Sequence, residues 1–289
     1  MKTYLKDLRW GKFNLIKGDM ISERAAHYGE WAETEVQLLR LLLQPHSTVI
    51  EIGANIGMHT VPLAKAVPSG KVLCFEPQRI IYQLLCCNLA LNDLVNVESY
   101  RLGVSEQNGT AWIESSDYTQ PWNYGSFSID KGFSTEYPFT GNISKEEIDI
   151  IALDDFAPIK RLDSLDLLKI DAEGFDANVL KGAVNTIRRF RPYIFVEFQY
   201  DTCDEVLHLL KQENYRVVWA VSLRYQPQNF YQSVPFNELD THAADTNFLA
   251  IPTERIENAD SRILPFINGL KEAVSAEDLD SNIPTIHIT

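Results

Sequence analysis

Two glycines and two carboxylates in the stretch 48–77 have the types and spacing that suit the binding of a nucleoside. Gly53 and Gly57 stand in a turn with the spacing Glu51-x-Gly53-x-x-x-Gly57, and Glu76 follows the next apolar run. Glycine takes positive φ without strain and lets the backbone approach a ligand closely. A carboxylate after the second strand of such a unit accepts hydrogen bonds from ribose hydroxyls. These residues indicate a site for a ligand with an adenosine end.

The same turn lacks the groups that bind phosphates. A Walker loop needs Gly-Lys-Ser/Thr before its helix and a dinucleotide loop needs G-x-G-x-x-G, and neither is present. Glu51 adds a negative charge that suits a cofactor carrying an ammonium and a sulfonium. S-adenosylmethionine has both groups, so the sequence favours this cofactor. The alternative is a generic nucleotide-binding turn with incidental carboxylates.

The elements that must position these residues alternate between strand and helix. The sequence predicts strands at 48–52, 72–75, 95–100, 167–170, 193–198, 215–220 and 247–251, and helices from about 58 and at 80–91, 175–187 and 203–212. This alternation is typical of an open parallel sheet. The strand, long loop and strand at the end of the chain predict an antiparallel pair. We expect an α/β fold with a seven-stranded, mostly parallel sheet and helices on both faces.

A second group of carboxylates follows the strand 167–170. Asp171 and Glu173 stand at its carboxyl end, and Glu197 ends the next strand. Open parallel sheets bind ligands at this edge, so these groups are candidates for a general base, a substrate clamp or a metal ligand. For Glu173, pairing with the helix start is the alternative. We assign the base to Asp171, with His242 or His59 as weaker candidates.

Metal chemistry is only weakly indicated. No Cys/His spacing suggests zinc, and no metal ligands are assigned. A divalent cation held by Asp171, Glu173 or Glu197 remains an option, because carboxylate oxygens suit Mg²⁺.

Aromatic side chains gather in the polar loop 115–144, and within it Trp122, Asn123 and Tyr124 are the candidates for binding the substrate. A long aromatic loop is typical of a lid or a binding wall. The alternative is a small core that covers the sheet edge. The segment 28–31, which begins with Tyr28, is expected to fold over the cofactor mouth, although Trp31 would serve equally to pack the following helix.

Composition limits the partners. The chain has 289 residues, 45% of them hydrophobic, and a formal net charge of −14. This charge opposes binding to nucleic acid, and no apolar run is long enough for a membrane span. The start has no secretory signal, and the four cysteines are expected to be reduced and buried, so we expect a cytoplasmic protein. One catalytic domain at 45–252 is predicted, with an N-terminal arm and helix (1–44) and a tail (253–289).

Several blocks together resemble the FkbM family of S-adenosylmethionine-dependent methyltransferases. They are Tyr-Gly-Glu-Trp at 28–31, Val-Ile-Glu-Ile-Gly-Ala-Asn-Ile-Gly at 49–57, Phe-Glu-Pro at 75–77, Asn-x-Gly at 123–125, Leu-Asp-Asp-Phe at 153–156, Lys-Ile-Asp-Ala-Glu-Gly at 169–174, Val-Leu-Lys-Gly-Ala at 179–183 and Asn-Phe-Leu at 247–249. The resemblance implies a class I methyltransferase fold and methyl transfer, commonly to an oxygen of a sugar or natural product. It also implies that Glu51, Gly53, Asn55 and Gly57 line the methionine end of the cofactor and Glu76 its ribose. Asp171 and Glu173 would lie near the transferring methyl group.

Two other functions remain open from the sequence. Glu76 would equally hold the ribose of a nicotinamide cofactor in an NAD-dependent oxidoreductase, although the dinucleotide fingerprint is absent. A binding protein that kept the fold and lost catalysis is the other. The acceptor, expected to be a small molecule or a glycan, and the oligomeric state are not fixed by the sequence.

Overall fold

The structure is a computed structural model. It describes residues 1–116, 118, 120–125, 127–128, 132–133, 141–257, 264–278 and 283–286. Of the predicted aromatic loop, Tyr137 and Phe139 lie outside the described residues.

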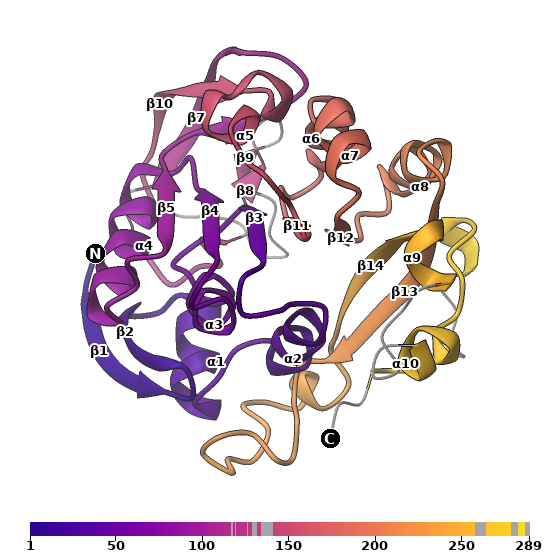
Figure 1. Cartoon of the computed structure of the whole chain (residues 1–289). Coiled ribbons are helices and arrows are strands. Elements are labelled where there is room, and N and C mark those ends of the chain that lie inside the picture. The colour runs from indigo at the N-terminus through magenta and orange to yellow at the C-terminus, as the bar shows by residue number, and fades with distance from the viewer. Residues whose placement is uncertain are drawn as a thin grey trace.

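A seven-stranded sheet forms the centre of the described chain (Figure 1). Its order is β13-β14-β12-β11-β3-β4-β5, and β14 alone runs antiparallel to its neighbours. The strands are β3 (Thr48–Ile52), β4 (Lys71–Phe75), β5 (Val97–Tyr100), β11 (Leu167–Ile170), β12 (Tyr193–Glu197), β13 (Tyr215–Leu223) and β14 (Ala244–Pro252). The predicted class I methyltransferase sheet is confirmed, including the antiparallel pair at its end.

Helices cover both faces of this sheet. The described α-helices are α1 (Met20–Tyr28), α2 (Glu33–Leu41), α3 (Thr60–Ala66), α4 (Arg79–Leu91), α5 (Ala157–Lys160), α6 (Asp176–Lys181), α7 (Val184–Phe190), α8 (Cys203–Gln212), α9 (Thr253–Glu257) and α10 (Leu264–Gly269). Val49 of β3 lies in the core with residues of α2, α3 and α4, whereas its neighbour Ile50 lies in the core with residues of α6, α7 and α8. Successive strand side chains point to opposite faces, so one strand supplies both cores.

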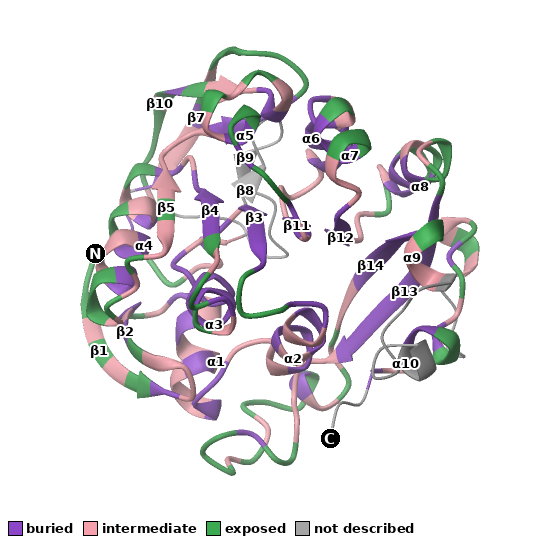
Figure 2. Cartoon of the chain, viewed as in Figure 1, coloured by how far each residue is buried: buried purple, intermediate pink, exposed green. Residues whose placement is uncertain are grey.

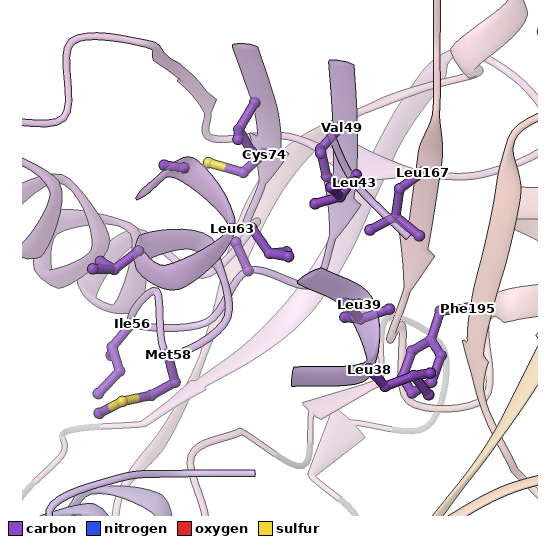
Figure 3. Packing of buried hydrophobic residues seen from close by; sticks show 14 of the residues in the cluster. Leu38, Leu39, Leu43, Val49, Ile56, Met58, Leu63, Cys74, Leu167 and Phe195 are labelled. Atoms are coloured by element: carbon purple, nitrogen blue, oxygen red, sulfur yellow. The ribbon is translucent and has the colours of Figure 1, made fainter. Parts of the chain in front are cut away.

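Burial of the central strands from both sides fixes the elements around the site. β3 is buried along its whole length, and Figure 2 shows the same for much of β13 and β14. On one face, Leu38 and Leu39 of α2 lie in the same core as Phe195 of β12 and Val49 of β3 (Figure 3). This packing holds α2 against the sheet. In the described ranges, no helix is both long and apolar enough to cross a bilayer.

The predicted helix over 175–187 is wrong in one respect, because the segment forms two helices, α6 and α7. The Gly182 backbone separates them and packs so closely that a Cβ there would lie 2.0 Å from the Ser105 carbonyl oxygen. Asp154 then accepts hydrogen bonds from the backbone N–H groups of Asn185 and Thr186 at 2.8 and 2.7 Å. A carboxylate that captures free N–H groups starts a new helix, so α7 begins after the glycine.

A second sheet contains the ends of the predicted aromatic loop. β7 (Gly109–Ser116) pairs antiparallel with β10 (Ile143–Ile151), which pairs with β6 (Gly103–Val104). The loop predicted over 115–144 is therefore shorter than expected, because its first and last residues belong to strands. A small pair, β8 (Phe127–Ser128) and β9 (Gly132–Phe133), lies within it.

The two ends of the chain pack on the central unit. The N-terminal arm is a hairpin of β1 (Thr3–Leu8) and β2 (Gly11–Ile16). At the other end, Ala273 N donates to Val217 O and Ile286 N donates to Val221 O, at 2.9 and 2.7 Å. The C-terminal segment thus follows the outer edge of β13. The four cysteines are free, and Cys86 and Cys87 are only half-buried, contrary to the expectation of burial.

Candidate functional site

A cavity of about 410 Å³ opens at the carboxyl ends of the central strands. Such a volume is in the range of small-molecule sites. Eight of the candidate residues named from the sequence line it, namely Gly53, Asn55, His59, Glu76, Asn123, Asp171, Glu173 and Glu197. The parallel sheet brings these groups together, because β3, β4 and β11 end at the same edge.

The turn after β3 brings the backbone to the cavity wall. Gly53 has φ +77°, and a Cβ at this position would lie 1.8 Å from the Asp171 carbonyl oxygen. Only glycine fits, because both the conformation and the space exclude a side chain. Asn55 follows with φ +49°, a left-handed conformation that asparagine tolerates better than most residues.

Glu76 is the buried carboxylate at the end of β4. Its Oε2 accepts from Asn55 N at 3.0 Å and its Oε1 accepts from Gln78 N at 2.9 Å. Burial raises the pKa of Glu76 to about 7, although both hydrogen bonds act in the opposite direction. Each oxygen accepts only one of these bonds, so both retain capacity for ligand hydroxyls. Glu76 is thus held at the cavity wall with acceptor capacity left on both oxygens.

The turn after β11 carries Asp171 and Glu173. Lys169, buried in β11 with only 2% of its side chain exposed, donates to Asp171 Oδ2 at 3.0 Å. Burial alone would lower the pKa of Lys169, but the Asp171 and Glu51 carboxylates raise it overall. Asp171 therefore lines the cavity as the partner of a buried ammonium.

Glu173 stands in a strained backbone. Its φ is +51°, in the left-handed region that costs a non-glycine residue about 1 kcal/mol or more. Asp176 holds this turn by accepting hydrogen bonds from Ala172 N and Gly174 N at 3.0 Å each. Strain held in place by the surroundings is common at functional sites. Glu173 is therefore directed to the cavity by its turn.

Three carboxylates meet at one point of the cavity. One oxygen each of Asp171, Glu173 and Glu197 lies within 4.8 Å of the others. Burial, together with the charge of Asp171, raises the pKa of Glu173 to about 8. Burial, together with the charges of Asp171 and Glu173, raises the pKa of Glu197 well above its ordinary value. This arrangement favours protons or another cation beside the cluster at neutral pH.

The family model of the methyltransferase FkbM domain matches residues 51–217, more than half of the chain. The chain belongs to this family. The resemblance recognised from the sequence motifs is thereby confirmed.

Curated relatives agree with this assignment. The chain is similar to methyltransferase sdnD of Sordaria araneosa, with 31% identity over 153 residues that cover 46% of this chain and 59% of that protein. It is also similar to the 2-O-methyltransferase NoeI of Sinorhizobium fredii, with 26% identity covering 56% of this chain and 67% of that protein. A solved FkbM methyltransferase from Methylobacillus flagellatus shares 19% identity, with a TM-score of 0.43, over 72% of this chain and 44% of that one.

Glu51 and Gly57, two of the residues expected at the methionine end of the cofactor, lie behind the cavity wall. Glu51 is buried, accepts from Thr60 Oγ1 at 2.7 Å and lies opposite Lys169 in the sheet register. Gly57, with φ +92°, closes the turn by donating its N–H to Ala54 O at 2.9 Å. Neither residue lines the cavity. Glu51 lies beside the buried Lys169, and Gly57 stabilises the turn after β3.

Tyr28 and His242 also lie away from the cavity lining. The Tyr28 hydroxyl donates to Asp240 Oδ2 at 2.7 Å and accepts from Phe236 N at 2.8 Å. It therefore fastens the loop after β13 to α1. His242 is an exposed residue of that loop. Because neither side chain reaches the cavity, we do not carry their predicted roles forward.

Of the three residues predicted to bind substrate, only Asn123 lines the cavity. Tyr124 is buried, and its hydroxyl donates to Gln120 O at 2.5 Å. Trp122 packs against the same core, and its backbone pairs with Gly18 and Met20. A Cβ on Gly125 would lie 2.6 Å from Asn55 Nδ2. This segment thus covers the Glu76 end of the cavity, and the aromatic rings face the core.

The sequence did not predict a polar wall of the cavity, which lies on the side away from Glu76. Glu35 of α2 accepts from Asn247 Nδ2 at 2.9 Å and from Ser222 Oγ at 3.2 Å, and its Oε2 lies 3.3 Å from His59 Nε2. Arg224 and Asp245 complete this wall. The available signal was Glu35 itself, a carboxylate on the apolar stripe of its helix, four residues before Leu39.

Proposed function

We propose that the protein is an S-adenosylmethionine-dependent methyltransferase that methylates a hydroxyl oxygen. The observation that carries this proposal is the buried Glu76 carboxylate, fixed by Asn55 N and Gln78 N beside the Gly53 turn in an FkbM domain. The donor set fits the cofactor, since a carboxylate suits ribose hydroxyls and the acidic wall suits a sulfonium. That a relative is a 2-O-methyltransferase supports oxygen as the atom methylated.

The residues of this chain supply position and a proton acceptor. When bound, the cofactor supplies a methyl group on an activated leaving group, so much of the catalysis comes from alignment. Glu76 holds the ribose, and the backbone at Gly53 allows close approach. Asp171, paired with Lys169, accepts the proton of the attacking hydroxyl. Glu173, with its pKa of about 8, is protonated at neutral pH and donates a hydrogen bond to the acceptor.

The N-terminal segment 1–44 is proposed to cover the cofactor mouth, with 45–252 as the catalytic unit and 253–289 as a tail. Trp31 and Ala32, which line the cavity, support the first part of this division. The segment between β7 and β10 is proposed as an aromatic insert or lid, and Asn123 and Gly125, which line the cavity, support this assignment.

The carboxylate cluster could act by binding a divalent cation, and this can be tested separately. Asp171, Glu173 and Glu197 present the oxygen ligands that Mg²⁺ prefers. If a cation holds the acceptor there, EDTA abolishes methyl transfer and added Mg²⁺ restores it. If activity survives EDTA unchanged, the cluster acts through its protons instead.

The experiment that tests the function combines binding and transfer. S-adenosylmethionine and S-adenosylhomocysteine are titrated into the protein by calorimetry, and transfer of a labelled methyl group to a panel of hydroxylated acceptors is measured. Asp171→Asn should keep cofactor binding and lose transfer. Absence of binding would exclude the proposal, and nicotinamide fluorescence on mixing would then test the oxidoreductase alternative. Binding without turnover on every acceptor would favour the inactive binding protein.

A further inference from the structure

An ion pair lines the cavity without a role in the function proposed above. Arg224 follows β13 and Asp245 lies in β14, and Arg224 Nη2 donates to Asp245 Oδ1 at 2.6 Å. Each side chain is 25% exposed, and both line the cavity. Arg224 N also donates to Ala243 O at 2.9 Å, which continues the pairing of β13 with β14. The pair is therefore fixed to the central sheet.

The sheet register aligns this pair with other polar groups. Asp245 lies two residues before Asn247, so their side chains share one face of β14. Asn247 is opposite Glu197 of β12 in the register, and Phe198 N donates to Thr246 O at 3.0 Å. Glu197, Phe198, Asp245 and Asn247 all line the cavity. The ends of three neighbouring strands thus form one continuous wall with an aromatic ring in it.

The Arg224–Asp245 pair has hydrogen-bonding capacity to spare. A guanidinium has five N–H donors, and a single side-chain bond, to Asp245, is found for it within the described chain. Its Nε is buried and has no hydrogen-bond partner among the described residues, so the donors left for a ligand are the remaining N–H groups of its two Nη atoms. The carboxylate likewise accepts more than one bond. Donors and acceptors stand side by side on a pair whose charges cancel, which suits hydroxyl groups better than ions.

The rest of the cavity narrows the chemistry of the acceptor. An anionic acceptor would approach the Asp171 carboxylate, whose charge opposes it, and would add negative charge beside Glu173 and Glu197. A flat apolar acceptor would cover the ion pair without replacing its bonds to water, which costs free energy. A pyranose ring offers hydroxyls at its rim and apolar C–H groups on its faces. Phe198 and Trp31 supply aromatic surface for those faces.

We propose that this wall is the acceptor subsite and that Arg224 and Asp245 bind a vicinal diol of an uncharged sugar. Arg224 donates to one oxygen, and Asp245 accepts from the neighbouring hydroxyl. The inference rests on the proposed methyltransferase function and names its substrate class. The hydroxyl next to this diol on the ring is the reacting one and is directed to Asp171.

The test uses neutral methyl glycosides as probes. Methyl mannoside, galactoside, fucoside and rhamnoside are assayed for labelled methyl transfer, and the methylated position is assigned by NMR. The best probe is then compared with an analogue that lacks the adjacent hydroxyl and keeps the reacting one. A uronic acid glycoside tests charge, and 2-naphthol tests a flat apolar acceptor. A site built to bind a hydroxyl should disfavour the deoxy analogue about 100-fold or more in kcat/KM.

Variants then separate recognition from folding. Arg224→Lys and Asp245→Asn should each reduce the preference for the diol over its deoxy analogue at least about tenfold. Transfer to the deoxy analogue should fall less than transfer to the diol, while the cofactor Kd and the melting temperature should change little. Arg188→Lys is the matched control, because Arg188 makes the same kind of side-chain pair with Glu213 at 2.7–2.8 Å and is not among the cavity-lining residues.

Each contrary result has its own meaning. A tenfold weaker cofactor Kd in Arg224→Lys would assign the pair to the cofactor and overturn the inference. An unchanged diol preference, or preferred methylation of the uronic acid or of 2-naphthol, would also overturn it. The inference is also overturned if no glycoside is methylated and none binds the complex of the protein with S-adenosylhomocysteine at millimolar concentration. In all these cases the unmodified protein still binds the cofactor, so the proposed methyltransferase function is kept. If the unmodified protein did not bind the cofactor, both the proposed function and this inference would be excluded.

Discussion

At the scale of single residues, Glu76 combines burial, two fixed hydrogen bonds and a raised pKa. Its carboxyl has a pKa of about 7 in the free protein against an ordinary value of 4.5. Below about pH 7 one oxygen carries a proton and cannot accept from a ribose hydroxyl. Cofactor affinity should therefore rise as the pH increases from 6 to 8 and then level off.

The substitution Glu76→Gln should flatten this dependence and weaken cofactor binding at pH 8 about tenfold, or roughly 1.4 kcal/mol. Calorimetry at each pH measures both effects. Glu173→Gln is the control, since its carboxyl titrates near pH 8 and should leave the rise near pH 7 in place. A pH profile that Glu76→Gln does not change would show that another group controls binding.

The same group affects folding with the opposite sign. Because the folded pKa of Glu76 is raised, the folded protein binds more protons than the unfolded chain between about pH 4.5 and 7. The cost of burying the charge is absent below this range and complete above it. Thermal stability of the free protein should fall as the pH rises through this range, and Glu76→Gln should make that fall smaller.

At the scale of elements, the two turns at the cavity use glycine for different reasons. Gly53 has φ +77° and no room for a Cβ, whereas Gly174 has φ +88° and nothing within 4 Å of the Cβ position. Gly174→Ala should cost about 1 kcal/mol, the conformational term alone. Gly53→Ala should cost several times more, since the Asp171 carbonyl must move. Urea denaturation of both variants tests this difference, and equal losses would contradict it.

At the scale of the whole molecule, the C-terminal segment completes both cores. Ile267, Leu270 and Ile286 belong to one core and Ala273 to the other. Removal of residues 258–289 takes this apolar surface away and leaves β13 as an open edge, which favours aggregation. We expect a loss of roughly 5 kcal/mol in the free energy of unfolding, from the buried side chains alone.

A point variant checks that result without shortening the chain. Ile267→Ala, at a fully buried position, should cost about 2–4 kcal/mol while cofactor affinity in the folded protein is kept. Thermal and urea unfolding measure the loss. If the truncated chain unfolds with the stability of the full chain, the segment is not part of the core.

Much of the fold could be predicted from the sequence, because its signals are local. The apolar run at 48–52, the glycine turn and the alternation of strands with helices each depend on neighbouring residues, and the structure has these elements with small shifts. The break between α6 and α7 could not be read in this way. It depends on Ser105 and Asp154, which are distant in the sequence.

The candidate site also has a part that could be predicted from the sequence and a part that depends on contacts between distant residues. The sequence by itself determined the family and the residues that follow strand ends, such as Glu76 and Asp171, because parallel strands end at one edge whatever the loops do. Only the tertiary structure decided which side chains reach the cavity. It placed Glu51 behind the wall, turned Tyr124 into the core and brought Arg224 beside Asp245, because burial and pairing depend on contacts between segments far apart in the chain.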